Sequence, residues 1–206
     1  MPLPNRVTVS VPGSSANLGP GFDCLGVALP LRLTVTAVRR PGPLAVHLSG
    51  EGASELPADA SNLVVATMLG DGDGDGLEVE IANDLPLAAG CGSSAAAIVA
   101  GVALGDALAG LAVAIEGHPD NIAAAVYGGF TIATADPPMV RRIEPPRGRG
   151  FVLAVPPERL ATSAARAALA EQALRADAVH NVQRVALLVS SLYTGSVDDL
   201  SAALPV

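Results

Sequence analysis

Alternation of hydrophobic and polar residues predicts β-strands in the N-terminal part of the chain. The stretches Val7–Val11 and Leu31–Val38 are rich in Val and Thr and repeat every two residues, as a strand with one buried face does. Between them the sequence predicts a glycine-rich loop, Pro12 to Gly26. Shorter segments of similar character predict strands at Leu44–Leu48, Leu77–Ala82, Phe130–Thr134 and Phe151–Val155.

Segments without this two-residue period predict helices. One is Asn62–Leu69, with Ser61 as a candidate N-cap. Another is the run of Ala, Ile, Val and Leu from Ser93 to about Leu108, which has no polar residue before Asp106 beyond its two leading serines and is typical of a buried helix.

A third helix is predicted at His118–Val126. Pro119 suits its first position, Asp120 suits its positive end, and the glycine pair at 128 and 129 ends it. Two further helices are expected, at Thr162–Leu169 and Ala178–Leu192. Because strands and helices are mixed without regular βαβ spacing, the pattern predicts an α+β fold.

Irregular segments divide this pattern. The Pro/Arg/Gly-rich stretch from Asp136 to Gly150 is the best candidate for a domain boundary. The tract GDGDGDG at 70–76 matches the opening of a calcium loop, but position twelve is Ala82 instead of Glu and a strand follows, so a flexible linker is favoured. This tract and the short passage at 105–116 also suggest that residues are absent at both places.

Composition narrows the class of protein. The 206 residues can bury a sizeable core, and with 50% apolar but only 2% aromatic residues that core must consist of Ala, Val and Leu. A net charge of −8 and scattered arginines argue against a nucleic-acid partner. The stretch MPLPNRVTVS lacks a basic region followed by an apolar run, so we expect no secretory signal, and no apolar run is long enough to span a membrane. Cys24 and Cys91 lie far apart, so we expect a reduced, cytoplasmic protein.

The most informative stretch is PLAAGCGSSAAA, from Pro86 to Ala97. Its glycines allow backbone N–H groups to approach a ligand closely, and the helix that follows places its positive end there. Such a turn predicts a phosphate site, and the competing interpretation is a tight turn before a core helix. All 12 basic residues are Arg, so there is no Walker-type lysine, and phosphate charge must be met by the helix dipole, Mg²⁺ and Arg.

Polar residues in two other places are candidates for chemistry beside this loop. Asn17 and Asp23 flank a sharp Gly-Pro-Gly turn, where they either face one pocket or satisfy backbone groups of the turn. Glu116, His118 and Asn121 surround a helix start, where they either bind a ligand or cap the helix. Among them, Glu116 is a candidate Mg²⁺ ligand because hard cations take carboxylate oxygens.

A third pair is Thr162 and Arg166, which are spaced i,i+4 and share one helical face. Arg offers a fork that matches a carboxylate, and the alternative is a solvated surface Arg.

Four segments of the chain, read together, resemble the homoserine kinase family, in the superfamily named for galactokinase, homoserine, mevalonate and phosphomevalonate kinases. In chain order they are VPGSSANLGPGFDCLG, NDLPLAAGCGSSAAAIVAG, EGHPDNIAAAVYGGF and LATSAARAALAEQ. The resemblance covers nearly the whole chain, and ANLGPGFD with HPDN is its most specific part.

This resemblance implies a ribosomal-protein-S5-like α+β domain at residues 1–145 and the start of a ferredoxin-like domain at 146–206. It implies that ATP phosphorylates L-homoserine to O-phospho-L-homoserine in threonine biosynthesis, with Mg²⁺ as cofactor and a homodimer as a common assembly. Family members continue beyond Val206 to another substrate-binding Arg and a late Gly/Ser-rich loop, so we expect weak or no activity from the chain as written. The alternatives are another small-molecule kinase of the superfamily or an inactive nucleotide-binding fragment.

The resemblance also implies roles for individual residues. Asn17, Asp23, His118, Asn121 and Arg166 match positions around the amino acid substrate, with Asp23 orienting or deprotonating its hydroxyl. Thr162 would lie near the transferred phosphoryl group, and Ser94 and Glu116 would hold Mg²⁺. The residues implied to wrap the ATP phosphates are Pro86, Leu87, Ala88, Ala89, Gly90, Cys91, Gly92, Ser93, Ser94, Ala95 and Ala96.

Overall fold

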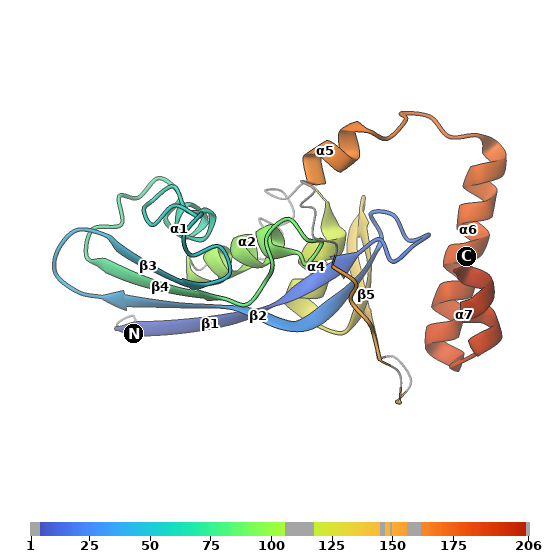
Figure 1. The fold of residues 1–206 in the computed structure, drawn as a ribbon, viewed down its shortest axis with the longest axis horizontal. Coiled ribbons are helices and arrows are strands. Elements are labelled where there is room, and N and C mark those ends of the chain that lie inside the picture. The colour runs from blue at the N-terminus through green and yellow to red at the C-terminus, as the bar shows by residue number, and fades with distance from the viewer. Residues whose placement is uncertain (1–4, 106–117, 145–146, 149, 156–161, 205–206) are drawn as a thin grey trace.

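The computed structural model describes residues 5–105, 118–144, 147–148, 150–155 and 162–204, and these form a mixed α/β fold with one sheet (Figure 1). Its strands are β1 (Arg6–Ala16), β2 (Leu25–Arg39), β3 (Ala45–Gly50), β4 (Leu77–Asn83), β5 (Phe130–Ala135) and β6 (Pro138–Ile143). Its helices are α1 (Leu63–Leu69), α2 (Ser93–Leu104), α4 (Pro119–Tyr127), α5 (Thr162–Ala167), α6 (Arg175–Thr194) and α7 (Val197–Ala203).

The long strand β2 organises the sheet. β1 pairs antiparallel along one edge of β2, while β5 pairs with Leu25–Val27 and β4 pairs with Leu33–Arg39 on the other edge. Apart from β1, the strand order is β3-β4-β2-β5-β6, in which β3 is parallel to β4 and the remaining pairs are antiparallel. The two partners of β2 therefore separate near Arg32, whose carbonyl accepts the Asp84 N–H at 2.9 Å, and the loop after β4 starts at this opening.

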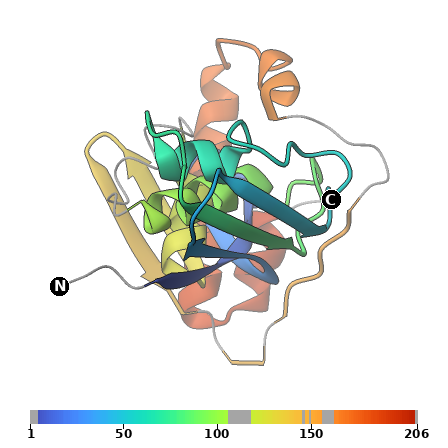
Figure 2. The same cartoon turned by 90° about the vertical axis from the view of Figure 1, so that its left-hand side faces the viewer.

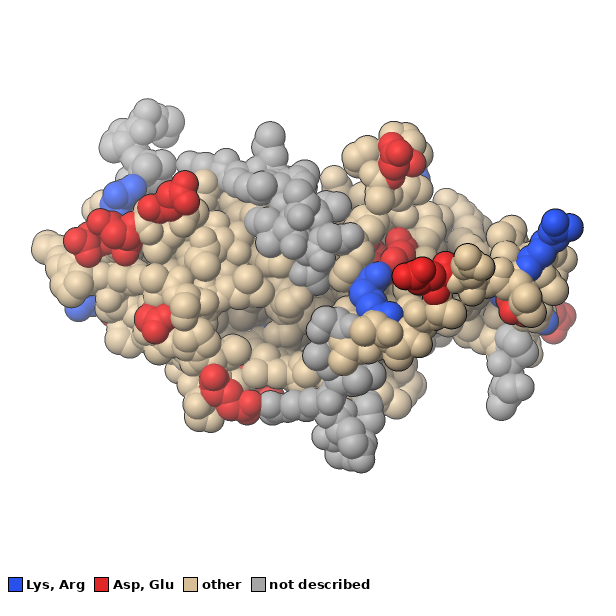
Figure 3. Space-filling model, turned by 90° about the horizontal axis from the view of Figure 1, so that it is seen from above, with Lys and Arg blue, Asp and Glu red and all other residues tan. Residues whose placement is uncertain are grey.

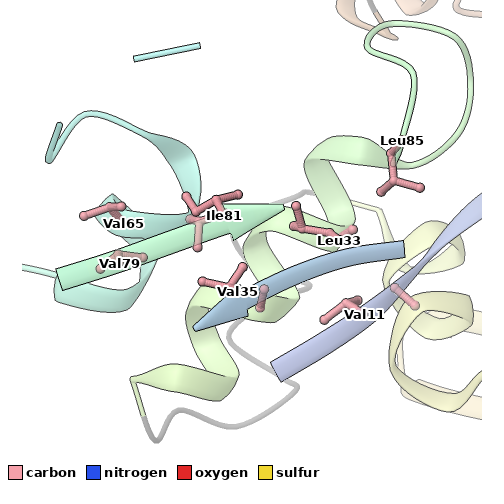
Figure 4. Close-up of a cluster of buried hydrophobic side chains, with 11 residues drawn as sticks. Val11, Leu33, Val35, Val65, Val79, Ile81 and Leu85 are labelled. Atoms are coloured by element: carbon pink, nitrogen blue, oxygen red, sulfur yellow. The ribbon is translucent and has the colours of Figure 1, made fainter. Parts of the chain in front are cut away.

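One face of the sheet carries the main core. Val35 and Val79 are fully buried there against Val65 of α1 and Ala96 of α2, and Ala125 of α4 completes the cluster (Figure 4). On the opposite face the same strands present hydroxyl pairs, such as Thr8 with Thr36 at 2.9 Å. This alternation is the two-residue period of the sequence seen in three dimensions.

A second apolar cluster attaches the last two helices to the sheet. Leu25 and Phe130 from the strands are buried with Leu188 of α6 and Ala203 of α7. The α6–α7 pair stands at the end of the sheet opposite α1, as both views show (Figures 1 and 2). In the part of the chain that the structure describes, none of the helices is long and apolar enough to cross a membrane.

The first two strands are longer than the sequence pattern predicts, so the loop between them is shorter. β1 continues to Ala16 through a register shift between Pro12 and Ser14, and β2 already begins at Leu25. A bulge tolerates the Pro-Gly pair that the sequence pattern marks as a loop. Gly13 is also required for packing, because a Cβ there would lie 2.5 Å from Leu85 and 2.8 Å from the Cys91 carbonyl.

Three other predictions need correction. Asn62, and not Ser61, caps α1: its Oδ1 accepts the Val64 N–H at 3.1 Å, while the Ser61 hydroxyl donates to Asp59. The predicted connector at 136–150 contains β6, which forms a hairpin with β5. The predicted strand Phe151–Val155 pairs with no strand in the described residues, and its Val152 is 97% exposed.

The remaining helices begin close to their predicted positions. α2 starts at Ser93 as expected and ends at Leu104, whereas its predicted end near Leu108 lies outside the described residues. α4 runs from Pro119 to Tyr127, one residue later at each end than predicted, with Pro119 at its first position and Gly128 as its C-cap, as expected. α6 is longer than predicted at both ends, and the sequence pattern does not predict α7.

Candidate nucleotide and substrate site

The loop from Asp84 to Gly92 joins β4 to the start of α2. Three of its residues, Ala88, Gly90 and Gly92, have left-handed backbone angles, with φ of 53°, 69° and 66°. Two of the three are glycines, which adopt this conformation without steric cost. The sequence therefore has glycine at two of the three positions where the loop backbone is left-handed, just before α2.

Gly92 anchors this loop to β1. A Cβ on Gly92 would lie 2.2 Å from the Ser14 hydroxyl oxygen and 2.8 Å from the Ser14 carbonyl oxygen, so only glycine fits this contact. The Ser14 N–H donates to the Cys91 carbonyl at 2.9 Å, and Cys91 is itself buried. The loop is consequently held by β1, a strand paired with β2, as well as by its own helix.

The start of α2 has the features of an anion site. Gly92 is its N-cap without a side-chain cap, and the first turn contains no acidic residue. The Ala96 N–H is bonded to the Gly92 carbonyl at 2.9 Å, and the amides before it belong to the first turn, which lacks intrahelical acceptors. Ser93 and Ser94 add hydroxyl groups at this positive end.

A cavity of about 290 Å³ adjoins this helix start. On the loop side it is lined by Leu87, Ala88, Ser93 and Ser94. Elsewhere its lining is mainly apolar and comes from α1, the segment before it and the sheet: Leu33, Leu56, Pro57, Asn62, Leu63, Val64, Ile81, Asn83 and Ala97. The start of α2 thus borders a pocket.

The sequence pattern does not indicate the part of this pocket that precedes α1. Asn62 is buried, and its Nδ2 donates to the Pro57 carbonyl at 2.9 Å while its Oδ1 caps α1. Asn62 therefore fixes the loop that carries Leu56 and Pro57 over the cavity. The available signal was the Asn at a helix start, but nothing in the chain order indicates that it lies beside the loop at 84–92.

A second group of polar residues lies on the loop between β1 and β2. Asn17 and Asp23 both have left-handed backbone angles, with φ of 67° and 54°, and the Asp23 N–H donates to Asn17 Oδ1 at 2.9 Å. This bond is the turn-satisfying role, one of the two alternatives for Asn17. The Asp23 carboxylate has a different partner, because Arg166 of α5 binds both of its oxygens.

The Asp23–Arg166 pair is geometrically a fork on a carboxylate. Arg166 Nη1 donates to Asp23 Oδ2 at 3.1 Å, Nη2 donates to Oδ1, and both side chains are about one-third exposed, at 34% and 37%. The guanidinium also lies 5.4 Å from the ring centre of Phe22. The hydrogen bonds that Arg166 donates to Asp23 raise the pKa of Arg166, so this side chain stays charged.

The start of α4 joins these two groups. Asn121 Oδ1 accepts the Ser14 hydroxyl at 2.8 Å, and Ser14 contacts Gly92 of the loop at 84–92. His118 and Asp120 precede it, and the charge of Asp120 contributes to the raised pKa of Arg166. The predicted residues Asn17, Asp23 and Arg166 are therefore in contact, and His118 and Asn121 lie on the element next to them.

The structure does not place two of the predicted site residues, Thr162 and Glu116, in contact with the others. Thr162 is the first residue of α5, one turn before Arg166, and its side chain is exposed. Glu116 lies outside the described residues, so of the two predicted Mg²⁺ ligands the structure describes Ser94 alone. The described residues contain no group of three His, Cys, Asp or Glu side chains suited to a metal ion. A hydroxyl and one carboxylate fit Mg²⁺, which keeps several waters and binds substrate phosphates in kinase sites.

Charge on the outer surface is dispersed. The face shown in Figure 3 carries small separate groups of acidic and basic side chains on a mostly uncharged surface. Among the described residues, Glu78 contacts both Arg40 and His47, and His47 Nε2 lies 3.0 Å from Glu78 Oε1. The hydrogen-bonded charges near the candidate site are instead Asp23, Arg166 and Asp120.

Comparison with known proteins gives a consistent result. Residues 60–129, which include the loop at 84–92 and α4, match the model of the GHMP kinase N-terminal domain. A homoserine kinase of Thermus thermophilus is 44% identical over 209 aligned positions, which cover 94% of this chain and 70% of that protein.

Solved structures agree with this match. The homoserine kinase of Cytophaga hutchinsonii superposes with a TM-score of 0.74 at 27% identity, covering 98% of this chain and 71% of that one. The Leishmania major mevalonate kinase in complex with R-mevalonate has a TM-score of 0.67 at 17% identity, covering 98% and 74%, which shows a shared fold alone.

Proposed function

This chain belongs to the homoserine kinase family of GHMP kinases, which are ATP-dependent, and we propose that the site described above transfers the γ-phosphoryl group of ATP to the hydroxyl of L-homoserine. The products would be O-phospho-L-homoserine and ADP. The observation that carries this proposal is the common anchor of the two halves of the site: Ser14 contacts both Gly92 of the loop and Asn121 of α4. Positioning of two substrates is the main requirement of phosphoryl transfer.

We propose that the ATP phosphates lie on the backbone from Pro86 to Ala96, at the positive end of α2. Support comes from the left-handed loop residues, the N-cap without a side-chain bond and the adjoining open cavity. Since the chain has no lysine, the helix dipole and the first-turn amides must supply much of the stabilisation. Ser94 and Glu116 are the proposed ligands of Mg²⁺, which when bound neutralises charge on the phosphates.

The same cavity is our candidate for the nucleotide base. Its walls combine apolar side chains, Leu56, Leu63 and Leu87, with the fixed amide of Asn62. An apolar slot with few polar groups is typical of a site for a flat heterocycle. The base would then sit beside α1 and direct the phosphates towards Ser93.

The acceptor pocket is proposed to consist of Asn17, Asp23, His118, Asn121 and Arg166, with Thr162 near the transferred group. In the structure the guanidinium of Arg166 is held by Asp23. A substrate carboxylate would share or take over this fork, because guanidinium binds carboxylates in the same bidentate geometry. Asp23 would then accept the homoserine hydroxyl. We favour orientation over proton removal, since an ordinary Asp is a weak base at neutral pH.

Two substitutions test these roles. Asp23→Asn keeps the size of the side chain, and we expect at least a tenfold loss of kcat because a neutral amide no longer accepts and orients the hydroxyl in the same way. Arg166→Ala should mainly raise the KM for homoserine and leave the KM for ATP near its original value. A homoserine KM that does not change in Arg166→Ala would contradict the carboxylate role.

Acceptor specificity is tested with purified protein, Mg-ATP and a panel of alcohols that includes homoserine, mevalonate and shikimate. ADP release dependent on homoserine alone is the expected result. Release with another alcohol would assign a different kinase of the superfamily, and ATP binding without any release would indicate a nucleotide-binding role. We further propose the S5-like and ferredoxin-like division at residue 145, a homodimer and a cytoplasmic location, by resemblance to the family. Sedimentation tests the homodimer, and limited proteolysis tests the domain division.

A further inference from the structure

Asn83, the last residue of β4, is a polar residue in the interior of the molecule. It is only 4% exposed, and it lies where the strand ends and the loop at 84–92 begins. Burial of a side-chain amide costs free energy unless its hydrogen-bonding groups have partners. The partners of Asn83 therefore show what this amide holds in place.

The amide of Asn83 is bonded to two separate segments. Nδ2 donates to the Glu51 carbonyl at 2.9 Å and to the Leu85 carbonyl at 3.2 Å, and Oδ1 accepts the Leu85 N–H at 3.0 Å. The reverse orientation of the amide would place its oxygen against two carbonyl oxygens, so these partners fix the side chain. Asn83 thus joins the segment after β3 to the first residues of the loop at 84–92.

The segment at 51–57, which we call the cover, is held at both ends by a buried asparagine. At its start the Glu51 carbonyl accepts from Asn83 Nδ2, and the Glu51 N–H donates to the Asn83 carbonyl at 2.7 Å. At its end the Pro57 carbonyl accepts from Asn62 at 2.9 Å. The last two residues of the cover line the cavity beside α2, so these two asparagines fix one of its walls.

The cover also runs close to the loop at 84–92. A Cβ on Gly52 would lie 2.5 Å from Leu87 Cδ1 and 3.2 Å from Leu56 Cδ1, so only glycine fits between these two side chains. Leu56 belongs to the cover, Leu87 belongs to the loop, and both line the cavity. Two walls of the cavity therefore approach each other at Gly52.

Asn83 sets the position of the cover relative to a fixed part of the molecule. Leu85 is fully buried in the main core cluster (Figure 4), and its backbone N–H and carbonyl are both bonded to Asn83. Apolar walls bind a ligand through contact, and a gap of about 0.5–1 Å already loses about a quarter to a half of the dispersion energy. The distance between the cover and the loop therefore determines how firmly a flat ligand is held in the cavity.

We propose that Asn83 is a positioning residue that holds the cover at contact distance from the nucleotide base and so determines how much the base contributes to nucleotide affinity. This inference rests on the proposed function, in which the base occupies this cavity. Asn83 should affect only ligands that carry a base. Binding of phosphate groups alone should change little, because the end of the loop is held separately, by the bond from the Ser14 N–H to the Cys91 carbonyl.

The first measurement is calorimetric binding of two probes with Mg²⁺ present: a non-hydrolysable ATP analogue, and inorganic tripolyphosphate, which lacks the base. We expect the wild type to bind the ATP analogue more tightly. Asn83→Ser keeps a hydroxyl that can accept the Leu85 N–H but is too short to reach the Glu51 carbonyl. This variant should bind the ATP analogue about tenfold more weakly and tripolyphosphate within about twofold of the wild type.

Gly52→Ala disturbs the same wall and leaves the Asn83 side chain intact. Its Cβ would press the cover away from Leu87, so the same selective loss for the ATP analogue is expected, and this variant replaces Asn83→Ser if the latter does not fold. Hydrogen exchange of the whole chain without ligand measures the movement of the cover directly. Amides at 51–57 should exchange about tenfold faster in Asn83→Ser than in the wild type, and those of α2 should be unchanged.

Asn181→Ser is the matched control, since Asn181 Nδ2 also donates to a backbone carbonyl, that of Pro20 at 2.8 Å. It should change neither the ratio of the two affinities nor the exchange at 51–57. An equal loss for both probes in Asn83→Ser, or unchanged exchange of the cover, would overturn the proposal. Equal affinities of the wild type for the two probes, with faster exchange of the cover in Asn83→Ser, would support the anchoring role of Asn83 and overturn the base site of the proposed function.

Discussion

Replacing Gly92 by Ala tests the contact between Gly92 and Ser14, which holds the loop at 84–92 against β1 of the sheet. Gly90 provides a matched control two residues away, because both glycines have left-handed backbone angles, with φ of 66° and 69°. They differ in their surroundings: a Cβ on Gly92 meets Ser14 at 2.2 Å, whereas a Cβ on Gly90 meets nothing within 4 Å. The pair therefore separates backbone strain from packing.

The expected magnitudes follow from these two terms. A non-glycine residue in the left-handed region costs about 1–2 kcal/mol, and this cost applies to Gly90→Ala and Gly92→Ala alike. Overpacking adds about 1–3 kcal/mol for Gly92→Ala alone. The total of about 2–5 kcal/mol is a large part of the stability of a typical domain, about 5–15 kcal/mol.

The assay is equilibrium unfolding in urea, together with binding of a fluorescent ATP analogue. We expect Gly92→Ala to lower the free energy of unfolding by about 1–3 kcal/mol more than Gly90→Ala does, with Tm following at about 2–4 °C per kcal/mol. ATP should bind more weakly to Gly92→Ala because the loop must move away from β1.

A double variant makes the explanation specific. Ser14→Ala removes the hydroxyl oxygen that the new Cβ would meet, so Ser14→Ala/Gly92→Ala should be less destabilised than the sum of the single variants. The reasoning would be refuted by a Gly92→Ala variant no less stable than Gly90→Ala. Strict additivity of the double variant would refute it as well.

Three further outcomes are expected. Gly26→Ala should destabilise by about 1–3 kcal/mol and weaken homoserine binding, since its Cβ would press on the Asp120 carbonyl from 2.5 Å; unfolding and calorimetry measure both. Leu25→Ala, which removes a fully buried side chain, should cost about 2–5 kcal/mol in urea unfolding, and a loss below about 1 kcal/mol would contradict the packing of α6 and α7 on β2. Burial raises the pKa of the Cys24 and Cys91 thiols, so less thiolate is present at pH 7 and both should react with iodoacetamide more slowly than a small-molecule thiol, with the rate rising as pH increases.

The elements of this fold could largely be predicted from local pattern, because strands and helices bury faces with periods of two and 3.6 residues. The failures share one cause, which is that pattern does not identify a partner. The predicted strand Phe151–Val155 has strand composition, yet no neighbouring strand pairs with it in the described residues. Ser61 and Asn62 are equally good caps by type, and the choice is decided by Asp59, which takes the Ser61 hydroxyl.

The candidate site shows the same limit. The type of its residues singles out the glycine-rich loop as a candidate phosphate site, whereas Asn17, Asp23 and Arg166 become favoured candidates only through the resemblance of their segments to the homoserine kinase family. Ser14 and the pocket before α1 could not be selected from the sequence, since their importance depends on contacts between distant segments. The sequence identifies Asp120 only as a favourable charge at a helix start, and its contact with His118 shows that it has a second partner.

These contacts would allow the proposed site, although it is built from loops, to hold two substrates at a fixed separation. Ser14 lies in a paired strand, donates its N–H to the Cys91 carbonyl and donates its hydroxyl to Asn121. Contacts with β1 consequently hold both the loop at the start of α2 and the start of α4 in place. The position of β1 is itself determined by pairing with β2 and by the buried core. A functional group placed on such a rigid element keeps its geometry when neighbouring loops move. The chain has no lysine, so in the proposed phosphate site helix dipoles and backbone amides take the place of a mobile ammonium group. Fixed placement matters more for such a site than for one with a lysine, because a dipole acts only on charge that lies directly in front of it.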